Sequence, residues 1–373
     1  SGSLQPPTVR LCHPLRDFFV RAKSIDFSPL CCYSLFWIKI CISGELQDEQ
    51  IKESLLQNLS DSIQTRPSVS SIPDAGSCGE CQKAVGARTV KPKQSLAQMK
   101  GILKVHKKLP LLMAVPTTAG TGSETTLAAV ITDAETRHKY AINDFPLIPR
   151  YAVLDPKVTL SLPPFVTATT GMDALTHAVE AYIGNSTTHG TRKDALLAVK
   201  LIFENIDTAY TNGSDIDARR NMLHASYYAG CAFTKSYVGY VHAVAHSLGG
   251  EYNVPHGYAN AVLLPYVLQE YGESIHKKLS KLAVAAGICT KETPCEQAAN
   301  AFIDEIKSMK QRFGIGNTIP QIREEDIPKL AHYADKEANP LYPVPVLMDA
   351  EELETFYHIL MEEDYEQKEE HAL

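Results

Sequence analysis

Apolar residues recur at helical spacing through most of the chain beyond the double proline at 163–164. Spacings of three and four residues place such side chains on one face of an α-helix. Little of this region shows the strict alternation that is typical of a half-exposed strand. We therefore expect an all-helical part from residue 163 to residue 373. The helices expected in it cover 166–183, 191–210, 215–235, 238–249, 257–273 and 293–313.

The region from 76 to 162 has a different pattern, in which short apolar runs alternate with helical segments. Ser95 is placed to cap the start of one of these helices. Short apolar runs that end at proline are typical of buried parallel strands. The region is therefore predicted to be an α/β domain. Its expected elements are a glycine-containing turn followed by a helix within 76–87, a second helix over 96–106, and strands over 109–115, 127–132 and 151–154.

The N-terminal region is harder to interpret. Residues 1–3 resemble an expression remnant, and no clean alternation of strands and helices follows over 4–75. Apolar residues at helical spacing predict one helix over 45–63. We expect residues 4–162 to form one α/β domain, divergent over 4–75, and residues 163–373 to form the helical domain.

Composition narrows the classes of protein. The chain has 373 residues, a formal net charge of −7 and nine cysteines. An acidic balance predicts no nucleic-acid partner, and an odd cysteine count in a long chain predicts a reduced, cytoplasmic protein. The apolar run at 31–42 is shorter than the roughly 20 residues that span a bilayer, so no membrane segment is expected.

Acidic and histidine side chains cluster in the predicted helical domain. Asp173 and His177 lie four residues apart, as do His242 and His246, and His256 follows a proline. Positions i and i+4 share a helix face, so each pair can reach one ion. Carboxylate oxygen and imidazole nitrogen suit Fe²⁺ or Zn²⁺. From residue types alone, a metal site and a set of ordinary core histidines both remain open.

Four segments of the sequence, three of them around these residues, resemble a known family. The segments GMDALTHAVEAY, VHAVAHSLGG and NVPHGYANAVLLPYV, and VPTTAGTGSE at 115–124, resemble the iron-containing (group III) alcohol dehydrogenases. The resemblance runs from about residue 83 to 345. It implies an α/β N-terminal Rossmann-like dinucleotide-binding domain and an all-α C-terminal metal-binding domain, a dehydroquinate synthase-like fold.

The resemblance also implies residue roles. Asp173, His177, His242 and His256 correspond to the family's ligands for Fe²⁺ or Zn²⁺. His246 is not a ligand and is the candidate catalytic residue, which transfers a proton beside the substrate. The implied reaction moves a hydride between a small alcohol or aldehyde and NAD or NADP, with the metal polarising the substrate oxygen. Family members are commonly homo-oligomers, and we expect a dimer.

The implied cofactor residues lie in two loops and one later segment. Where the family has a glycine-rich phosphate loop, this chain has DAGSCGECQK, in which Gly76 and Ser77 match while Asp74 and Ala75 replace glycines. Such a loop brings backbone N–H groups close to a pyrophosphate, and added side chains crowd that approach. The other residues expected to bind the nucleotide are Thr117, Thr118 and Thr121 in the second loop, and Lys139.

Two alternative functions remain open at this point. The first is a glycerol-dehydrogenase-like polyol oxidoreductase, a relative with the same fold. A non-catalytic metal-binding homologue is the second alternative, because the altered loop at 74–80 departs from the family pattern.

Overall fold

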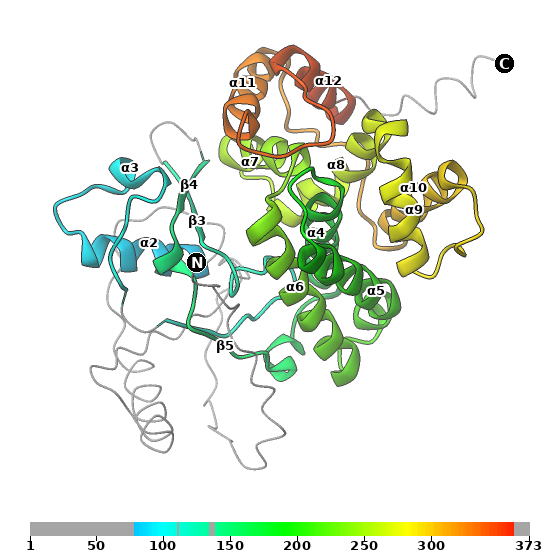
Figure 1. The fold of residues 1–373 in the computed structure, drawn as a ribbon, viewed down its shortest axis with the longest axis horizontal. Helices are drawn as coiled ribbons and strands as arrows, with labels where there is room; N and C mark the ends of the chain where they lie inside the picture. Colours follow the sequence, from blue (N-terminus) through cyan, green and yellow to red (C-terminus); the bar gives the residue numbers. More distant parts are fainter. Residues whose placement is uncertain (1–77, 110–111, 134–138, 362–373) are drawn as a thin grey trace.

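The computed structural model describes residues 78–109, 112–133 and 139–361. Within them, an α/β part and a helical part lie side by side (Figure 1). The order of the two parts is as predicted from the sequence. The helix predicted over 45–63 lies outside the described residues.

Two helices and five short strands make up the described α/β part. The strand β4 lies in the middle of a three-stranded sheet, parallel to β1 and antiparallel to β3, while β2 and β5 form a separate parallel pair. Helix α2 packs against β3 over a small apolar core. The elements are α2 (Cys78–Val90), α3 (Leu96–Met99), β1 (Gly101–Ile102), β2 (Met113–Ala114), β3 (Ala128–Thr132), β4 (Lys139–Asn143) and β5 (Tyr151–Ala152), followed by the short turns η1 (Phe145–Leu147) and η2 (Pro156–Thr159).

The helix predicted over 96–106 is much shorter in the structure. Ser95 caps it as predicted, in a capping box with Gln98. The helix ends at Met99 because Gly101 adopts φ +101°, a conformation that a helix cannot contain. The chain then enters β1, so the prediction was correct at the start of the helix and wrong at its end.

The strand predictions were partly correct. The strands expected over 127–132 and 151–154 are present as β3 and β5, and the run at 109–115 contains β2. Strand β4 was not predicted, because KYAIN has only one fully buried side chain, Ile142, and therefore lacks a clear alternation. It also makes the larger sheet mixed rather than parallel.

Nine α-helices form the described helical part. The six predicted helices are present within a few residues of their expected bounds, and α9, α11 and α12 were not among them. The helices are α4 (Pro164–Ile183), α5 (His189–Thr211), α6 (Ile216–Ser236), α7 (Tyr240–Tyr252), α8 (His256–Tyr271), α9 (Glu273–Ala285), α10 (Cys295–Arg312), α11 (Ile327–Ala338) and α12 (Ala350–Met361), with the turn η3 (Glu324–Asp326) before α11.

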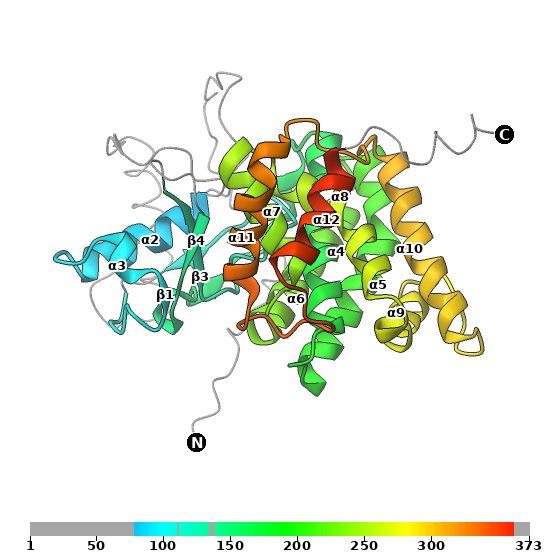
Figure 2. The ribbon, with the colours of Figure 1, turned by 90° about the horizontal axis from the view of Figure 1, so that it is seen from above.

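Helix α4 is the centre of this part, as both views show (Figures 1 and 2). It contacts α5, α6, α8 and α9. Sixteen of its twenty residues are buried, so it has no solvent face on which to place polar side chains. Any carboxylate or imidazole on α4 must therefore find its partners inside the protein.

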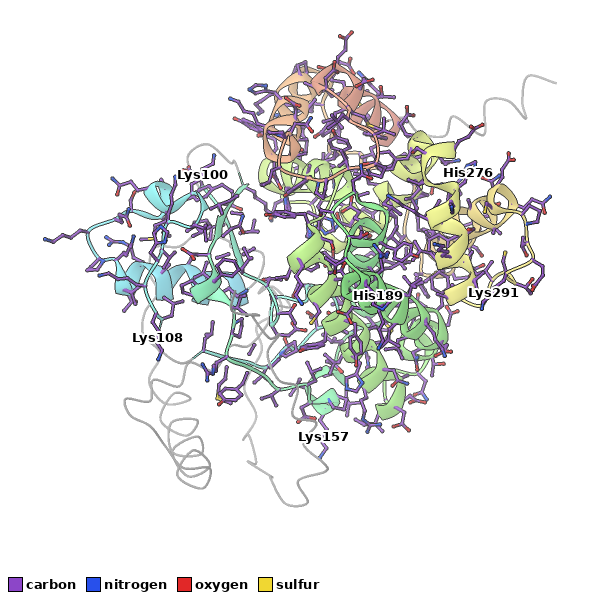
Figure 3. All side chains as sticks on the ribbon, viewed as in Figure 1. Lys100, Lys108, Lys157, His189, His276 and Lys291 are labelled. Atoms are coloured by element: carbon purple, nitrogen blue, oxygen red, sulfur yellow. The ribbon has the colours of Figure 1, made fainter. Side chains whose placement is uncertain are left out.

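Basic side chains on the surface are spread over the molecule. Lys100 lies on the α/β part, Lys157 on η2, and Lys291 on the far side of the helical part (Figure 3), all three exposed. Among the described residues, no helix has both the length and the apolar character that crossing a membrane requires.

The loop at 116–126 connects the α/β part to the helical part. It packs so closely against α6 that only glycine fits at the point of contact. Gly122 has φ +56°, and a Cβ on Gly230 of α6 would lie 2.9 Å from the Gly122 carbonyl oxygen and 2.3 Å from Thr125 Oγ1. Glycine at 230 therefore allows the loop backbone to rest directly on α6.

Replacing Gly230 with alanine is expected to lower the free energy of unfolding by about 1–3 kcal/mol, because the added methyl group must displace backbone. The measurement is urea denaturation of the two proteins. Gly190→Ala is the matched control, since its Cβ meets only Thr188 Oγ1 at 3.9 Å in the first turn of α5. Equal stability of Gly230→Ala and wild type would contradict the close contact.

Candidate metal centre

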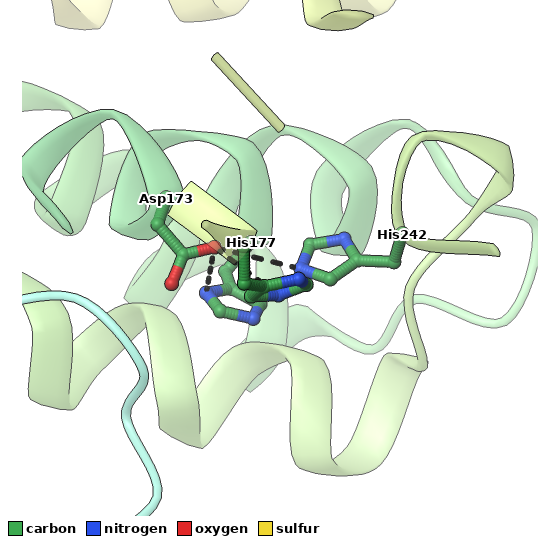
Figure 4. A group of neighbouring side chains, drawn as sticks. Asp173, His177 and His242 are labelled. Carbon is green, nitrogen blue, oxygen red and sulfur yellow. Dashed lines mark ion pairs between the residues drawn. The ribbon is translucent and has the colours of Figure 1, made fainter. Parts of the chain in front are cut away.

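The four residues predicted as metal ligands come together in the helical part. Asp173 and His177 lie on α4, His242 on α7, and His256 at the first position of α8. One ligand atom from each lies within 4.8 Å of the other three. Figure 4 shows Asp173, His177 and His242 pointing toward one another.

The carboxylate of Asp173 is the point on which the histidines converge. Its Oδ1 atom lies 3.9 Å from His177 Nδ1, 3.8 Å from His242 Nε2 and 3.6 Å from His256 Nε2. These separations are too long for direct hydrogen bonds. They leave space for an atom that contacts several of the ligand atoms at once.

An amide hydrogen-bonds with part of this cluster. Asn260 Nδ2 lies 2.7 Å from Asp173 Oδ1, 3.2 Å from His242 Nε2 and 3.1 Å from His256 Nε2. One NH₂ group has two hydrogens and faces three acceptors. In addition, His177 Nδ1 is buried without a hydrogen-bond partner. Lone pairs therefore exceed donors at this position, which is the arrangement that suits a cation.

The electrostatics of the cluster agree with that conclusion. Burial raises the pKa of Asp173, and the nearby His242 and the Asn260 amide only partly oppose it. Burial, followed by the neighbouring histidines, holds the pKa values of His177 and His256 well below the ordinary range. The two imidazoles are therefore neutral and keep the lone pairs that a metal ion requires. The residues present fit a divalent metal ion.

A close helix contact places the third element of the cluster. A Cβ on Gly257 would lie 2.5 Å from the carbonyl oxygen of Thr169 on α4. Because glycine has no side chain, the first turn of α8 can approach α4 closely enough for His256 and Asn260 to reach Asp173.

Glu180 is a functional residue that the sequence interpretation missed. Its Oε2 atom lies 2.5 Å from His242 Nδ1, and its Oε1 atom accepts a hydrogen bond of 2.9 Å from the Val241 backbone N–H. Burial lowers the pKa of His242, but the surrounding carboxylates, Glu180 first and then Asp173 and Glu337, together outweigh burial and raise the pKa. The contact fixes the ring so that Nε2 faces the cluster. Glu180 lies two turns after Asp173 on the same helix face, and this spacing was the available signal.

His246, the predicted catalytic residue, lies beside the cluster and is held by α11. Its ring stacks on that of His256 with centroids 5.0 Å apart. Its Nδ1 atom lies 2.6 Å from Glu337 Oε1, which also accepts a 2.7 Å hydrogen bond from the Tyr342 hydroxyl. Neither Glu337 nor Tyr342 was identified from the sequence, because their partner lies about ninety residues earlier in the chain.

Four of the residues predicted to bind the nucleotide are described by the structure, three in one loop and one at the start of β4. Thr117, Thr118 and Thr121 lie in the loop at 116–126, where Thr118 is buried and the other two are half-buried. Lys139 begins β4, and its Nζ atom would lie 2.8 Å from a Cβ on Gly249 of α7. The structure thus brings Lys139 to the same helix as His242 and His246.

The remaining two predicted nucleotide residues, Gly76 and Ser77, lie outside the described residues. The structure does describe Lys83, a few positions later on α2. Lys83 is fully buried, and its amine donates to the carbonyl oxygens of Ser123, Thr126 and Ala128 and to the Thr126 hydroxyl at 2.7–3.1 Å. This lysine therefore anchors the second loop.

Glu124 lies in the same loop and is buried without hydrogen-bond partners at either carboxyl oxygen. Burial raises its pKa from 4.5 to about 7, against the opposing effects of its backbone and of Lys83. The group was not identified from the sequence, where it looks like an ordinary polar residue at the end of a small-residue loop.

Replacing Glu180 with glutamine is expected to weaken metal affinity about 10–100-fold, because the ring of His242 loses its carboxylate partner. The measurement is competition with a chelator of known affinity, which reports binding without any activity assay. Glu204→Gln, an exposed position on α5, is the matched control. An unchanged dissociation constant would show that Glu180 has no part in ligand positioning.

The pKa of Glu124 predicts a pH dependence of stability. The folded value of about 7 lies above the ordinary 4.5, so the folded protein holds this proton more tightly and loses stability as pH rises from about 4.5 to about 7. At about 1.4 kcal/mol per pH unit, the loss is about 3 kcal/mol. We expect the difference in unfolding free energy between wild type and Glu124→Gln to change by this amount over that window. Denaturation at a series of pH values measures it, and parallel profiles would contradict it.

Comparisons with known proteins agree with the geometry. Residues 75–156 match the family described as iron-containing alcohol dehydrogenase, and residues 167–361 match the C-terminal region of the Fe-containing alcohol dehydrogenase family. The chain is 39% identical over 266 residues to 1,3-propanediol dehydrogenase from Klebsiella pneumoniae, covering 71% of this chain and 68% of that protein.

Solved structures give the same assignment. A 1,3-propanediol oxidoreductase structure has a TM-score of 0.72 at 37% identity, covering 76% of this chain and 74% of the other. A sulfoacetaldehyde reductase from Bifidobacterium kashiwanohense, in complex with NAD⁺, has a TM-score of 0.65 at 30% identity, covering 77% and 74%. These matches favour an alcohol dehydrogenase over the two alternatives considered from the sequence. The chain belongs to the iron-containing alcohol dehydrogenase family and is a metal-dependent alcohol dehydrogenase.

Proposed function

We propose that this enzyme oxidises short primary alcohols and reduces the corresponding aldehydes, with NAD⁺ as hydride acceptor and Fe²⁺ as metal. The four-residue cluster, with more lone pairs than donors, is the observation that carries the proposal. The similarity to propanediol dehydrogenases supports a short substrate, and the NAD⁺ complex of a relative supports NAD over NADP. Zn²⁺ accepts the same ligands, so metal analysis decides between the two ions.

The proposed ligands are Asp173, His177, His242 and His256. One carboxylate and three imidazoles, each neutral when it binds a metal, would leave a divalent ion with net positive charge, and the surrounding helices bury most of the cluster. When bound, the metal supplies Lewis-acid polarisation of the substrate oxygen, and the nicotinamide supplies the hydride acceptor. Glu180 holds one imidazole in the orientation that this arrangement requires.

We assign proton transfer to His246. Because Glu337 occupies Nδ1, the nitrogen left to exchange a proton is Nε2. Tyr342 holds the same carboxylate oxygen, and burial together with Glu337 keeps the pKa of its hydroxyl well above the ordinary value. Tyr342 therefore remains a donor and keeps Glu337 in place, while His246 takes up the alcohol proton.

Nucleotide binding is assigned to both loops and to β4. We propose that Thr117, Thr118 and Thr121 contact the nucleotide through hydroxyl and backbone groups, that Lys139 contacts its phosphates, and that Gly76 and Ser77 approach them through backbone amides. The division into domains at about residue 162, the homodimer and the cytoplasmic location remain predictions from the sequence.

Titration of the iron-loaded protein with NADH and NADPH, followed by fluorescence, tests the proposal. We expect saturable NADH binding and turnover of 1-propanol or 1,3-propanediol. Asp173→Asn should lose bound metal and turnover but still bind NADH, because it alters only the metal cluster. Asp304→Asn, exposed on α10, controls for the loss of a charge. Failure of the metal-loaded protein to bind either nucleotide would leave a metal-binding protein without its hydride source.

A further inference from the structure

Asn260 is a fully buried amide at the metal cluster that is not among the proposed ligands. It lies on α8 four residues after His256, so the two side chains share one face of the helix. Its Nδ2 atom lies 2.7 Å from Asp173 Oδ1, the atom on which the three histidines converge. An uncharged group in this position acts on the metal site through the ligands that it contacts.

The two ends of the Asn260 amide differ in their contacts. The NH₂ group faces three acceptors at 2.7–3.2 Å, whereas Oδ1 is buried with no hydrogen-bond partner. A buried acceptor without a donor costs stability. A leucine has the same branched outline and no polar atoms, so it would avoid this cost. Packing alone therefore does not explain an asparagine here, and its N–H groups do.

The carboxylate of Asp173 depends on this amide for its orientation. Among the residues that the structure describes, Asn260 makes the one hydrogen bond that the Asp173 carboxylate accepts. The nearest nitrogens of the three proposed histidine ligands lie 3.6–3.9 Å from Asp173 Oδ1, beyond hydrogen-bond distance. Removing the amide would leave the carboxylate free to turn within the cluster.

The number of lone pairs on each acceptor shows which contact of Asn260 is compatible with a bound metal ion. A carboxylate oxygen can accept more than one contact, whereas a neutral imidazole has a single lone pair. Asn260 can therefore donate to Asp173 Oδ1 and leave a second lone pair of that oxygen for a cation. The contacts with His242 and His256, at 3.2 and 3.1 Å, are longer and involve the lone pair that each ring would give to the metal.

We propose that Asn260 is a positioning residue for the metal, which donates from Nδ2 to Asp173 Oδ1 and holds the carboxylate in the orientation that binds the ion. The inference rests on the proposed function, because it takes Asp173 as a metal ligand. Hydrogen bonds of this kind to the carboxylate ligands of a metal fix their geometry and raise affinity.

Asn260→Leu tests the inference, because it keeps the branched outline and removes both N–H groups. The dissociation constant for Zn²⁺, measured by competition with a chelator of known affinity, should rise about 10–100-fold. At saturating Co²⁺, the visible absorption bands of the ion should also change, because they report the arrangement of the ligands. Asn260→Ala, which adds no atoms to the core, should change both readouts in the same direction. It supplies the measurement if the leucine variant does not fold.

A double-mutant cycle tests the contact itself without any metal. In the presence of chelator, Asn260→Leu should lower the urea midpoint of the wild type, because the buried carboxylate loses its donor. In an Asp173→Ala background the same substitution should have little effect, since the acceptor is already absent. Additive shifts in the urea midpoint would contradict the proposed contact.

Asn205→Leu is the matched control. This asparagine lies half-buried on α5, where its Nδ2 atom donates to the Leu201 carbonyl oxygen at 2.8 Å and its Oδ1 atom accepts from Asn221. The control also loses an amide from the helical part, and it should leave the Zn²⁺ dissociation constant and the Co²⁺ spectrum at their wild-type values. A general loss of stability would lower the urea midpoint in both proteins without altering that spectrum.

Wild-type affinity for Zn²⁺ in Asn260→Leu and Asn260→Ala, with an unchanged Co²⁺ spectrum, would overturn the inference and leave Asn260 as a packing residue. Metal binding by the wild type is a separate readout. If the wild type binds no metal, the proposed function and the inference both fail. If the wild type binds metal and turns over alcohol while the variants bind metal equally well, only the inference fails.

Discussion

A buried carboxylate without sufficient positive charge around it is the constraint on which the helical part depends. Asp173 lies on a helix that has no solvent face, and burial raises the pKa of this residue. An uncompensated charge is costly in an apolar interior, and a divalent cation held by the four proposed ligands would remove that cost. The contact of α8 with α4 at Gly257 therefore serves the proposed metal site as well as the core.

Two further carboxylates, Glu180 and Glu337, contact histidines of helix α7, and the difference in their burial gives them different roles. Glu180 is 2% exposed and contacts His242, a proposed ligand, so its charge acts mainly on the orientation and basicity of that histidine. Glu337 is 22% exposed and contacts His246, which is not a ligand. Its carboxylate therefore acts on the orientation of the histidine to which we assign proton transfer. Similar contacts between carboxylate and imidazole thus orient a proposed metal ligand in one case and the proposed proton-transfer residue in the other.

The sequence predicted what depends on local spacing and missed what depends on tertiary contact. The i and i+4 spacing on α4, and the periodicity of six helices, follow from the geometry of a single helix. Contacts such as His246 with Glu337 join residues 91 positions apart, and no local pattern specifies them. The α/β part was harder to predict for a related reason, since its strands are two to five residues long and one glycine, Gly101, ends a helix that the pattern would continue.

Lys83 connects helix α2 to the loop that we assign to the nucleotide. In the sequence it falls within the segment that resembles a phosphate loop, yet the structure buries its amine among carbonyl oxygens of the second loop. A fully buried lysine with several protein acceptors serves structure, so this side chain is not offered to a phosphate. Its contacts join α2 to the loop that rests on α6, and the carbonyl of Gly120 in that loop also acts on His177. Hydride transfer needs the nucleotide and the metal in a fixed relative position, and in the function we propose this chain of contacts joins the loop assigned to the nucleotide to His177, a proposed metal ligand.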